Sequence, residues 1–474
     1  MDRPMYIRHR SRRVITLPAI VWVGLALFLL GVGVGIGELL LRSSVGDWLE
    51  LKMESAQYHL LELLPQPDHP DFVPTPIVDT ENRADTSKVA WSANPPDAGT
   101  THDPSATLRT ATDAEATSGM ATETPQAVPV IADEPSPTAS TTKPTNAGAT
   151  NAPAPIPAES VELQAIQPSV QLTGVIPEAQ RFNNCGPTTL RMYFSFYGYT
   201  KDTQVQIANV LKPNTQDKNV SPYELVGYAE SRGFHAIARV NGSLDRIKQT
   251  LSNGLPIMIE EGYDPPRANK GWMGHYLLIT GYDAQGITAQ DSYDGPNQHV
   301  SWQDLDANWR NFNRTYLLVY PPEQEAIIRS IVGDDWDDAT MYSKAAQRAQ
   351  DEWNANPKDA FAAFNLGSSL VGLGEYEAAA QAFDQARILK LPWRMLWYQF
   401  GPYEAYYRVG RYQEVVALAD ATQKGIGDLE EAYYYKGLAL EKLGQVDAAR
   451  ASFQLALKYN PNYQAAQEAL KEVS

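Results

Sequence analysis

Residues 180–199, QRFNNCGPTTLRMYFSFYGY, contain the only cysteine of this 474-residue chain. After the cysteine, apolar side chains recur at helical spacing, and Gly198 supplies a stop signal. Pro187 suits a first helical turn, where its missing N–H costs nothing. The pattern predicts a helix with Cys185 at its N-terminus, where the helix dipole and free backbone N–H groups favour a thiolate. The alternative is that Cys185 is a small apolar residue in a core.

The composition excludes several classes of protein. A chain of this length predicts two or three domains. The net charge of −17 argues against a nucleic-acid-binding protein, which would present a basic face. One cysteine permits neither an intramolecular disulfide nor a thiolate zinc site, and the seven histidines are scattered without an HExxH pattern. We therefore expect no metal and no cofactor.

Residues 14–37 form an uncharged apolar stretch that predicts a transmembrane helix. At 1.5 Å per residue, this stretch spans a hydrocarbon core of about 30 Å. It is longer than the apolar part of a cleaved signal peptide, and no small-residue cleavage site follows it. A cleaved export signal is the alternative. Basic residues precede the stretch, so residues 1–13 are expected to be a cytoplasmic tail and the remainder of the chain extracytoplasmic. The basic residues that precede the apolar stretch are Arg3, Arg8, Arg10, Arg12 and Arg13.

Two further segments are expected between this helix and the first folded domain. Residues 38–64 can continue as a juxtamembrane helix near the membrane surface. Residues 65–160 are dominated by Pro, Thr, Ala, Ser and Asp, without an apolar period. Such a stretch buries too little apolar surface to offset the entropy of ordering it. It is predicted to be a disordered, partly extended linker that holds the folded domains away from the membrane.

Residues 161–322 return to a globular pattern. Two more helices are expected, at 221–234 and 243–254, each opened by a serine cap. Short apolar runs then predict strands joined by tight turns, with DAQG as a hairpin connection. These runs are 255–260, 275–283, 286–293 and 315–322. Helices followed by an antiparallel sheet indicate an α+β domain.

Three polar residues of this domain are candidates to act with the cysteine. His275 begins one predicted strand and Asp291 ends the next, so pairing through the DAQG turn brings them together. An imidazole can take the thiol proton and later protonate a leaving amine, while a carboxylate orients the imidazole. Gln180 can offer its amide, with the Cys185 backbone N–H, to a developing oxyanion. The pattern is typical of thiol acyl transfer.

These residues carry a resemblance to a known family. Q…CGPTTLRMYFSFYGY, GLPIMI, GHYLLITGYD and DSYDGP resemble the papain-like cysteine peptidases related to the bacteriocin-processing (family 39) peptidases, and more closely their stand-alone bacterial branch. The resemblance implies a nucleophile at Cys185, a general base at His275, an orienting acid at Asp291 and an oxyanion-hole glutamine at Gln180. In many papain-like enzymes the glutamine lies six residues before the cysteine, whereas here it lies five. No GxxxxGK[ST] motif occurs, which argues against coupling to an ATP-driven transporter.

Other side chains of the domain have simpler interpretations. Asp294 is the alternative orienting carboxylate, since Asp291 can instead begin a turn. Asp283 is interpreted as a turn residue. Trp272 can line a substrate groove or pack beneath a loop. The two remaining histidines of the domain, His235 and His299, lack a partner pattern and are interpreted as structural.

Residues 338–474 show helical periodicity with self-similarity near 34 residues. Two units, starting near 360 and 431, share Gly, Ala and Phe at matched offsets, and a weaker unit lies between them. They resemble tetratricopeptide repeats, which implies an all-α solenoid whose groove binds peptide or protein. A rigid spacer is the alternative. Residues 342–357 and 463–473 are expected to be flanking helices, and Tyr433, Tyr434 and Tyr435 are candidates for the groove or the core.

Together these features predict a membrane-anchored extracytoplasmic cysteine peptidase. It would be a papain-like thiol hydrolase with an α+β catalytic domain, linked to a repeat domain that binds a protein substrate or partner. One alternative is a catalytically inactive, surface-anchored scaffold that binds peptide or protein. The other is a thiol-dependent amide transferase, because an amine as well as water can take a thioester intermediate.

Overall fold

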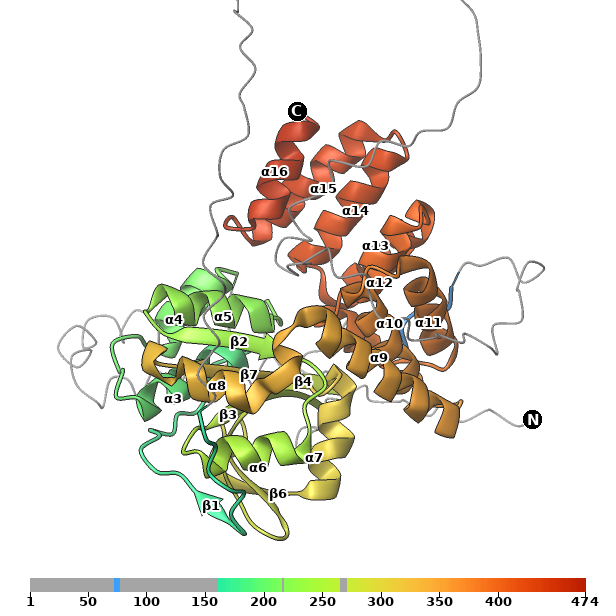
Figure 1. Ribbon diagram of the computed structural model, residues 1–474. Helices are drawn as coiled ribbons and strands as arrows, with labels where there is room; N and C mark the ends of the chain where they lie inside the picture. The colour runs from blue at the N-terminus through green and yellow to red at the C-terminus, as the bar shows by residue number, and fades with distance from the viewer. Residues whose placement is uncertain (1–71, 77–160, 215–216, 265–270) are drawn as a thin grey trace, which may run out of the picture. The chain divides into compact units, whose positions relative to one another are not determined.

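The computed structural model describes residues 72–76, 161–214, 217–264 and 271–474 (Figure 1). The predicted cytoplasmic tail, transmembrane helix and juxtamembrane helix lie outside the described residues, as does most of the predicted linker. Within the described ranges, no helix combines the length and apolarity needed to cross a bilayer.

The described residues of the first folded domain contain a seven-stranded sheet in which each ladder is antiparallel. The strand order is β2-β7-β3-β4-β5-β6, and β1 pairs with β4 outside this path. Strand β4 is therefore central, between β3 and β5. The strands are β1 (Val170–Gln171), β2 (His235–Arg239), β3 (Ile257–Tyr263), β4 (Met273–Tyr282), β5 (Gly286–Asp291), β6 (Gly295–Ser301) and β7 (Tyr316–Tyr320).

Helices cover both faces of this sheet (Figure 1). Along β7, Leu317 and Val319 face one set of three helices, whereas Tyr316, Leu318 and Tyr320 face a second set of three on the opposite face, as the two-residue period of a strand requires. Burial on both faces explains why the central strands are nearly continuous apolar runs. The first set is α3 (Cys185–Phe196), α4 (Gln204–Leu211) and α5 (Pro222–Ser231); the second is α6 (Leu244–Ser252), α7 (Trp302–Trp309) and α8 (Glu325–Val332).

The α+β layout expected from the sequence is confirmed, with elements that the pattern did not predict. The predicted helices correspond to α3, α5 and α6, and the predicted strands to β3, β4, β5 and β7. Strands β2 and β6 and helices α4, α7 and α8 were not expected. The sequence of β6, GPNQHVS, is mostly polar and half-exposed, so it carries no strand pattern and is defined by pairing with β5.

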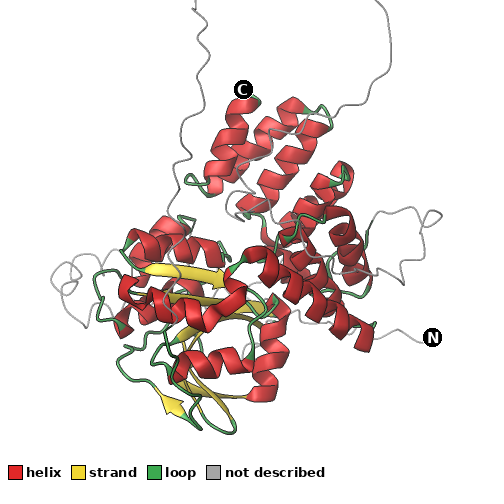
Figure 2. Cartoon of the chain, viewed as in Figure 1, coloured by secondary structure: helices red, strands yellow, loops and turns green. Residues whose placement is uncertain are grey.

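The second folded domain is entirely helical (Figure 2). Consecutive helices pack as antiparallel hairpins, and the predicted flanking helices correspond to the first and last of the series. Tyr434 and Tyr435 are buried in its core and Tyr433 packs against it, so these tyrosines serve the core. The helices are α9 (Asp338–Ala355), α10 (Ala360–Gly372), α11 (Tyr376–Ile388), α12 (Gly401–Arg408), α13 (Tyr412–Ile426), α14 (Glu430–Lys442), α15 (Val446–Tyr459) and α16 (Gln464–Glu472).

A glycine facing a phenylalanine brings the two helices of a repeat together. A Cβ added at Gly367 in α10 would lie 2.7 Å from Phe383 Cε1 of α11. The same contact recurs between Gly437 of α14 and Phe453 of α15. Both phenylalanines are fully buried. The matched offsets of Gly and Phe in the sequence therefore reflect this close helix contact.

Residues 72–76 differ from the expectation of a disordered linker. Phe72 forms an antiparallel bridge with Pro392, and the N–H of Val73 donates to the carbonyl of Leu391 at 3.0 Å. Val73 is only 3% exposed, within the core of the repeat domain. Composition did not reveal this segment, because one buried valine and a few main-chain hydrogen bonds leave no periodic pattern.

Substituting Gly367 by Ala is expected to lower the free energy of unfolding of the repeat domain by about 1–3 kcal/mol, because the added methyl overpacks against Phe383. Urea denaturation followed by circular dichroism measures this change. Gly227→Ala in the interior of α5 is the matched control, since nothing lies within 4 Å of its added Cβ. The Gly227→Ala control should raise the free energy of unfolding by up to about 1 kcal/mol. Equal effects of the two substitutions would contradict the close-contact interpretation.

Candidate active site

Helix α3 begins at Cys185, as predicted, directly after the N-cap Asn184. The N-cap side chain makes no capping hydrogen bond, and the preceding Asn183 has a left-handed φ of 52°. As the first helical residue, Cys185 has a backbone N–H without an intrahelical acceptor. Its side chain is half-buried, so it is not sealed in a hydrophobic core.

Gly186 allows this end of α3 to approach the sheet closely. A Cβ at Gly186 would lie 3.4 Å from the ring of Tyr276 in β4 and 3.5 Å from Val220. One turn later, the Thr189 hydroxyl donates to the Tyr276 carbonyl at 3.3 Å. The start of α3 is thereby held against the strand that carries His275.

His275 and Asp291 meet across the β4–β5 hairpin, as the sequence predicted. Asp291 lies opposite Leu277, which places it diagonally from His275 on the same face. His275 Nε2 lies 2.8 Å from Asp291 Oδ1, and both side chains are buried. The same carboxylate oxygen accepts the backbone N–H groups of Tyr293 and Asp294. Asp294, the alternative carboxylate, thus contributes its main chain to the site.

His275 also lies close enough to Cys185 to influence the pKa of the thiol. Because Nε2 faces Asp291, Nδ1 is the ring nitrogen left for the sulfur. Burial alone would raise the pKa of Cys185, but the neighbouring His275 and the charge of Lys212 lower it. Burial alone would lower the pKa of His275, but Asp291 and Cys185 raise it well above its ordinary value. Both directions favour the thiolate–imidazolium form of the pair over its neutral form.

Gln180 lies beside the turn that follows Asp291. Its backbone N–H donates to the Ser292 carbonyl at 2.8 Å, and its Oε1 accepts the Ser292 hydroxyl at 2.8 Å. With Oε1 held in this way, the side-chain NH₂ is the group that can serve an oxyanion. The structure therefore ties Gln180 to the Asp291 turn.

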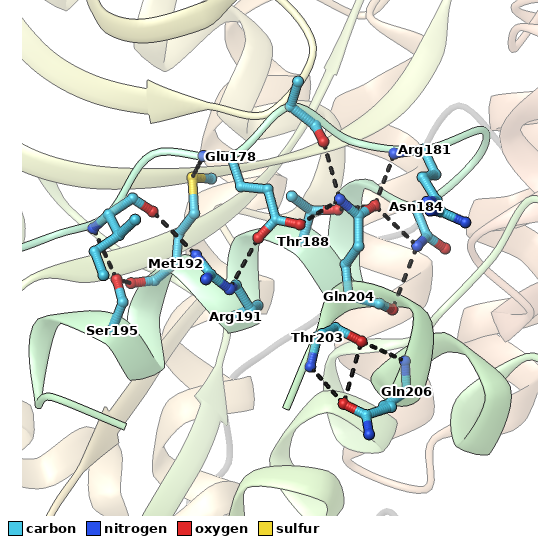
Figure 3. Close-up of polar contacts among 12 residues, drawn as sticks. Glu178, Arg181, Asn184, Thr188, Arg191, Met192, Ser195, Thr203, Gln204 and Gln206 are labelled. Carbon is cyan, nitrogen blue, oxygen red and sulfur yellow. Dashed lines mark hydrogen bonds and ion pairs between the residues drawn. The ribbon is translucent and has the colours of Figure 1, made fainter. Parts of the chain in front are cut away.

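A buried glutamine that sequence analysis did not identify organises the loop before Cys185 (Figure 3). Gln204 Oε1 accepts from the Arg181 backbone N–H at 2.7 Å, from Asn184 Nδ2 at 3.2 Å and from the Thr188 hydroxyl at 3.0 Å. Its Nε2 donates to Glu178 Oε1 at 2.6 Å and to the carbonyl of residue 179 at 2.9 Å. One side chain thus holds both the loop and the first turn of α3. Only its position after the Thr203 cap marks Gln204 in the sequence, and that signal indicates a helix start.

Lys212 is a second residue that sequence analysis missed. Its ammonium group is buried and donates to the carbonyls of Asn183 at 2.7 Å and Asp217 at 2.9 Å. The first bond supports the left-handed residue two positions before Cys185. The charge of Lys212 also contributes to lowering the pKa of the thiol.

A pocket opens at Cys185, and side chains from both folded domains line it. Glu260 of β3 lies in its wall, and burial raises the pKa of this carboxyl well above its ordinary value. Tyr398, which follows the 3₁₀ turn η6 (Trp393–Trp397) of the repeat domain, lines the same pocket. A Cβ at Gly274 of β4 would lie 3.0 Å from the Tyr398 ring, so this glycine allows the close approach. The repeat domain therefore forms part of the pocket wall beside Cys185.

Two stretches of the chain match models of known protein families. Residues 163–317 match the model of the Peptidase_C39 like family, and residues 430–463 match the tetratricopeptide repeat model. The chain carries a C39-like peptidase domain followed by tetratricopeptide repeats. No curated protein matches the sequence.

Among solved structures, a putative C39-like peptidase from Bacillus anthracis is 18% identical, covering 32% of this chain and 96% of that one, with a TM-score of 0.27. A double glycine motif protease from an AMS/PCAT transporter, in complex with the leader peptide, is 15% identical over 32% of this chain and 94% of that one, with a TM-score of 0.25. The protein MamA is 15% identical over 31% of this chain and 82% of that one, with a TM-score of 0.27.

The remaining residues singled out in the C39-like domain have structural contacts. Trp272 stacks on Phe312 with ring centroids 5.8 Å apart and packs against the repeat-domain core, which fits its packing interpretation. Asp283 closes the DAQG turn by accepting two backbone N–H groups. His235 and His299 contact surface carboxylates. Among the described residues, no group of three or more His, Cys, Asp or Glu side chains is arranged to hold a metal ion.

Replacing Gln204 by Ala is expected to loosen the loop before Cys185, because five hydrogen-bonding partners lose a buried group. The free energy of unfolding should fall by about 1–3 kcal/mol or more, and alkylation of Cys185 at pH 6 should slow. Gln206→Ala, on the exposed side of the same helix, is the matched control and loses only its part of a capping box. Normal Cys185 reactivity in Gln204→Ala would contradict a role in positioning the nucleophile.

Proposed function

We propose that this protein is a membrane-anchored extracytoplasmic cysteine peptidase that hydrolyses peptide bonds. The proposed catalytic residues are Cys185, His275 and Asp291, with Gln180 in the oxyanion hole. The observation that carries the proposal is the buried His275–Asp291 pair, 2.8 Å apart, placed next to Cys185 at the start of α3 so that it lowers the pKa of the thiol. The match to the C39-like family model supports the same chemistry.

In the proposed reaction, Cys185 Sγ attacks the carbonyl carbon of the scissile peptide bond as a thiolate. His275, protonated in the resting pair, gives its proton to the leaving amine as the C–N bond breaks. The resulting thioester is hydrolysed by water, whose proton returns to His275 while the thiolate leaves. Asp291 keeps the imidazole oriented and stabilises its positive charge.

The oxyanion of each tetrahedral intermediate would be stabilised by two donors. The Cys185 backbone N–H is free of an intrahelical acceptor and lies at the positive end of α3. The Gln180 NH₂ group is the second, since Ser292 already holds the carbonyl end of that amide. The five-residue spacing between glutamine and cysteine is accommodated by the loop that Gln204 holds.

The repeat domain is proposed to bind a protein substrate or partner. Tetratricopeptide repeats present surfaces that bind peptides, and Tyr398 brings this domain to the pocket at Cys185. Membrane anchoring rests on the apolar stretch at 14–37 and the arginines that precede it. In this proposal the catalytic and repeat domains act together outside the cytoplasm.

The rate of Cys185 alkylation by iodoacetamide should follow the thiolate fraction. Because the site lowers the pKa of the Cys185 thiol, the pH at which the alkylation rate reaches half its maximum should fall below the free-thiol pKa of about 8.5. His275→Ala removes the positive charge beside the sulfur, so the pH midpoint of alkylation should rise, with at least a roughly tenfold slower rate at pH 6. His299→Ala is the matched control on the surface. A midpoint near 8.5 that His275→Ala does not move would favour the inactive scaffold.

Peptidase activity itself is tested by incubating the full chain in detergent with a peptide library and identifying new termini by mass spectrometry. Cys185→Ala should abolish cleavage, a loss of roughly a thousandfold or more, whereas His299→Ala should not. Cleavage that persists in Cys185→Ala would contradict the proposal. Adding a free amine separates the alternatives, because a transferase would yield products that carry the amine at the new C-terminus.

A further inference from the structure

Arg387 of α11 is a buried cation in the repeat domain. Its side chain is 2% exposed, among the most deeply buried large side chains of the described residues. Its Nη1 donates to Glu414 Oε1 of α13 at 2.7 Å, and its guanidinium lies 5.3 Å from the ring of Tyr406. A buried arginine requires partners for its remaining N–H groups, since an unpaired buried donor is costly.

Those partners are main-chain carbonyls of residues 72–76. Arg387 Nε donates to the Pro74 carbonyl at 2.7 Å, and Nη2 donates to the Thr75 carbonyl at 3.2 Å. Two donors of one planar guanidinium thus contact successive carbonyls of an extended chain. Because both contacts are to the main chain, they recognise an extended backbone.

The same segment meets a second set of contacts at the end of α11. The Val73 N–H donates to the Leu391 carbonyl at 3.0 Å, and the Val73 side chain enters the repeat-domain core. Phe72 pairs with Pro392, and Lys390 Nζ lies 5.3 Å from the Phe72 ring. Phe72 is exposed and the next residue, Val73, is buried, as expected for successive side chains of an extended segment, which point to opposite sides. The site therefore combines a buried position for one small branched side chain with the Leu391 carbonyl, which accepts from the segment, and the Arg387 guanidinium, which donates to it.

We propose that the surface formed by Arg387, Lys390, Leu391 and Pro392 is a peptide-binding site whose resident ligand is the chain's own residues 72–76. Its ligand class is an extended peptide with valine at the buried position, followed by proline. Proline at positions 74 and 76 suits this class, because its fixed φ favours extended backbone and it brings no N–H that needs a partner. A protein that carries such a segment would bind here by displacing residues 72–76.

The pairing of Phe72 with Pro392 gives a direct test in the full chain. In a Cys185→Ser background, the double variant Phe72→Cys/Pro392→Cys should form an intramolecular disulfide rapidly under mild oxidation, because bridge partners lie within disulfide distance. The control pair is Phe72→Cys/Glu377→Cys, since Glu377 lies about 15 Å from Arg387 along the same helix. Equal rates for the two pairs, or a disulfide between two chains, would overturn occupancy in cis.

Two matched substitutions test the recognition of the segment. Val73→Asp places a charge in the core and should slow the cross-link at least tenfold, whereas Thr75→Asp adds the same charge at an exposed position and should change the rate less than twofold. Equal effects of these two substitutions would contradict a buried position for Val73. The readout is independent of catalysis, so it also distinguishes failure of this proposal from failure of the peptidase proposal.

Binding of a separate peptide tests whether the surface accepts a ligand in trans. A fluorescent peptide of residues 70–78, PDFVPTPIV, should bind the Val73→Asp chain, whose own segment is released, at least tenfold more tightly than the unsubstituted chain. Adding Arg387→Ala to Val73→Asp should abolish that binding, and circular dichroism establishes that the helices persist. No binding to the Val73→Asp chain at 1 mM peptide would overturn the assignment of a peptide-binding site.

Discussion

The chemistry proposed for this protein depends on the contact between the first turn of α3 and the hairpin formed by β4 and β5. Cys185 gains its acidity from His275, and His275 keeps its proton because of Asp291. These groups come from a helix and two strands separated by about ninety residues of sequence. If the start of α3 moved away from His275, the Cys185 thiol would lose the group that lowers its pKa. Burial would then raise the pKa of the thiol.

Much of the surrounding structure compensates the cost of bringing charged groups out of water. Asp291 accepts two backbone N–H groups besides His275, so its charge is stabilised from three directions. Lys212 balances the sulfur while fixing the Asn183 carbonyl. Gln204 satisfies five polar groups of the loop and helix start with one amide. Networks in which each member is paired stabilise one arrangement, whereas partly satisfied ones are costly.

The repeat domain is joined to the C39-like domain by polar contacts as well as by packing. Arg310 forms ion pairs with Glu352 and Asp359, and Arg314 forms one with Glu352. Tyr398 extends this contact to the pocket at Cys185. Tyr398 lies six residues after Pro392, at which Phe72 pairs, so the peptide site and the pocket share one short stretch of chain.

Local elements with strong patterns could be predicted from the amino-acid sequence. It placed Cys185 at a helix start, His275 and Asp291 on neighbouring strands, and the Gly and Phe positions of the repeats, because helix spacing, strand alternation and turn residues are short-range signals. Tertiary structure alone decided the roles of Gln204 and Lys212, the pairing of the polar strand β6, the position of Tyr398 and the docking of Val73. Each of these depends on which distant groups a side chain meets once the chain is folded, and a single buried partner produces no periodicity that a sequence pattern can reveal.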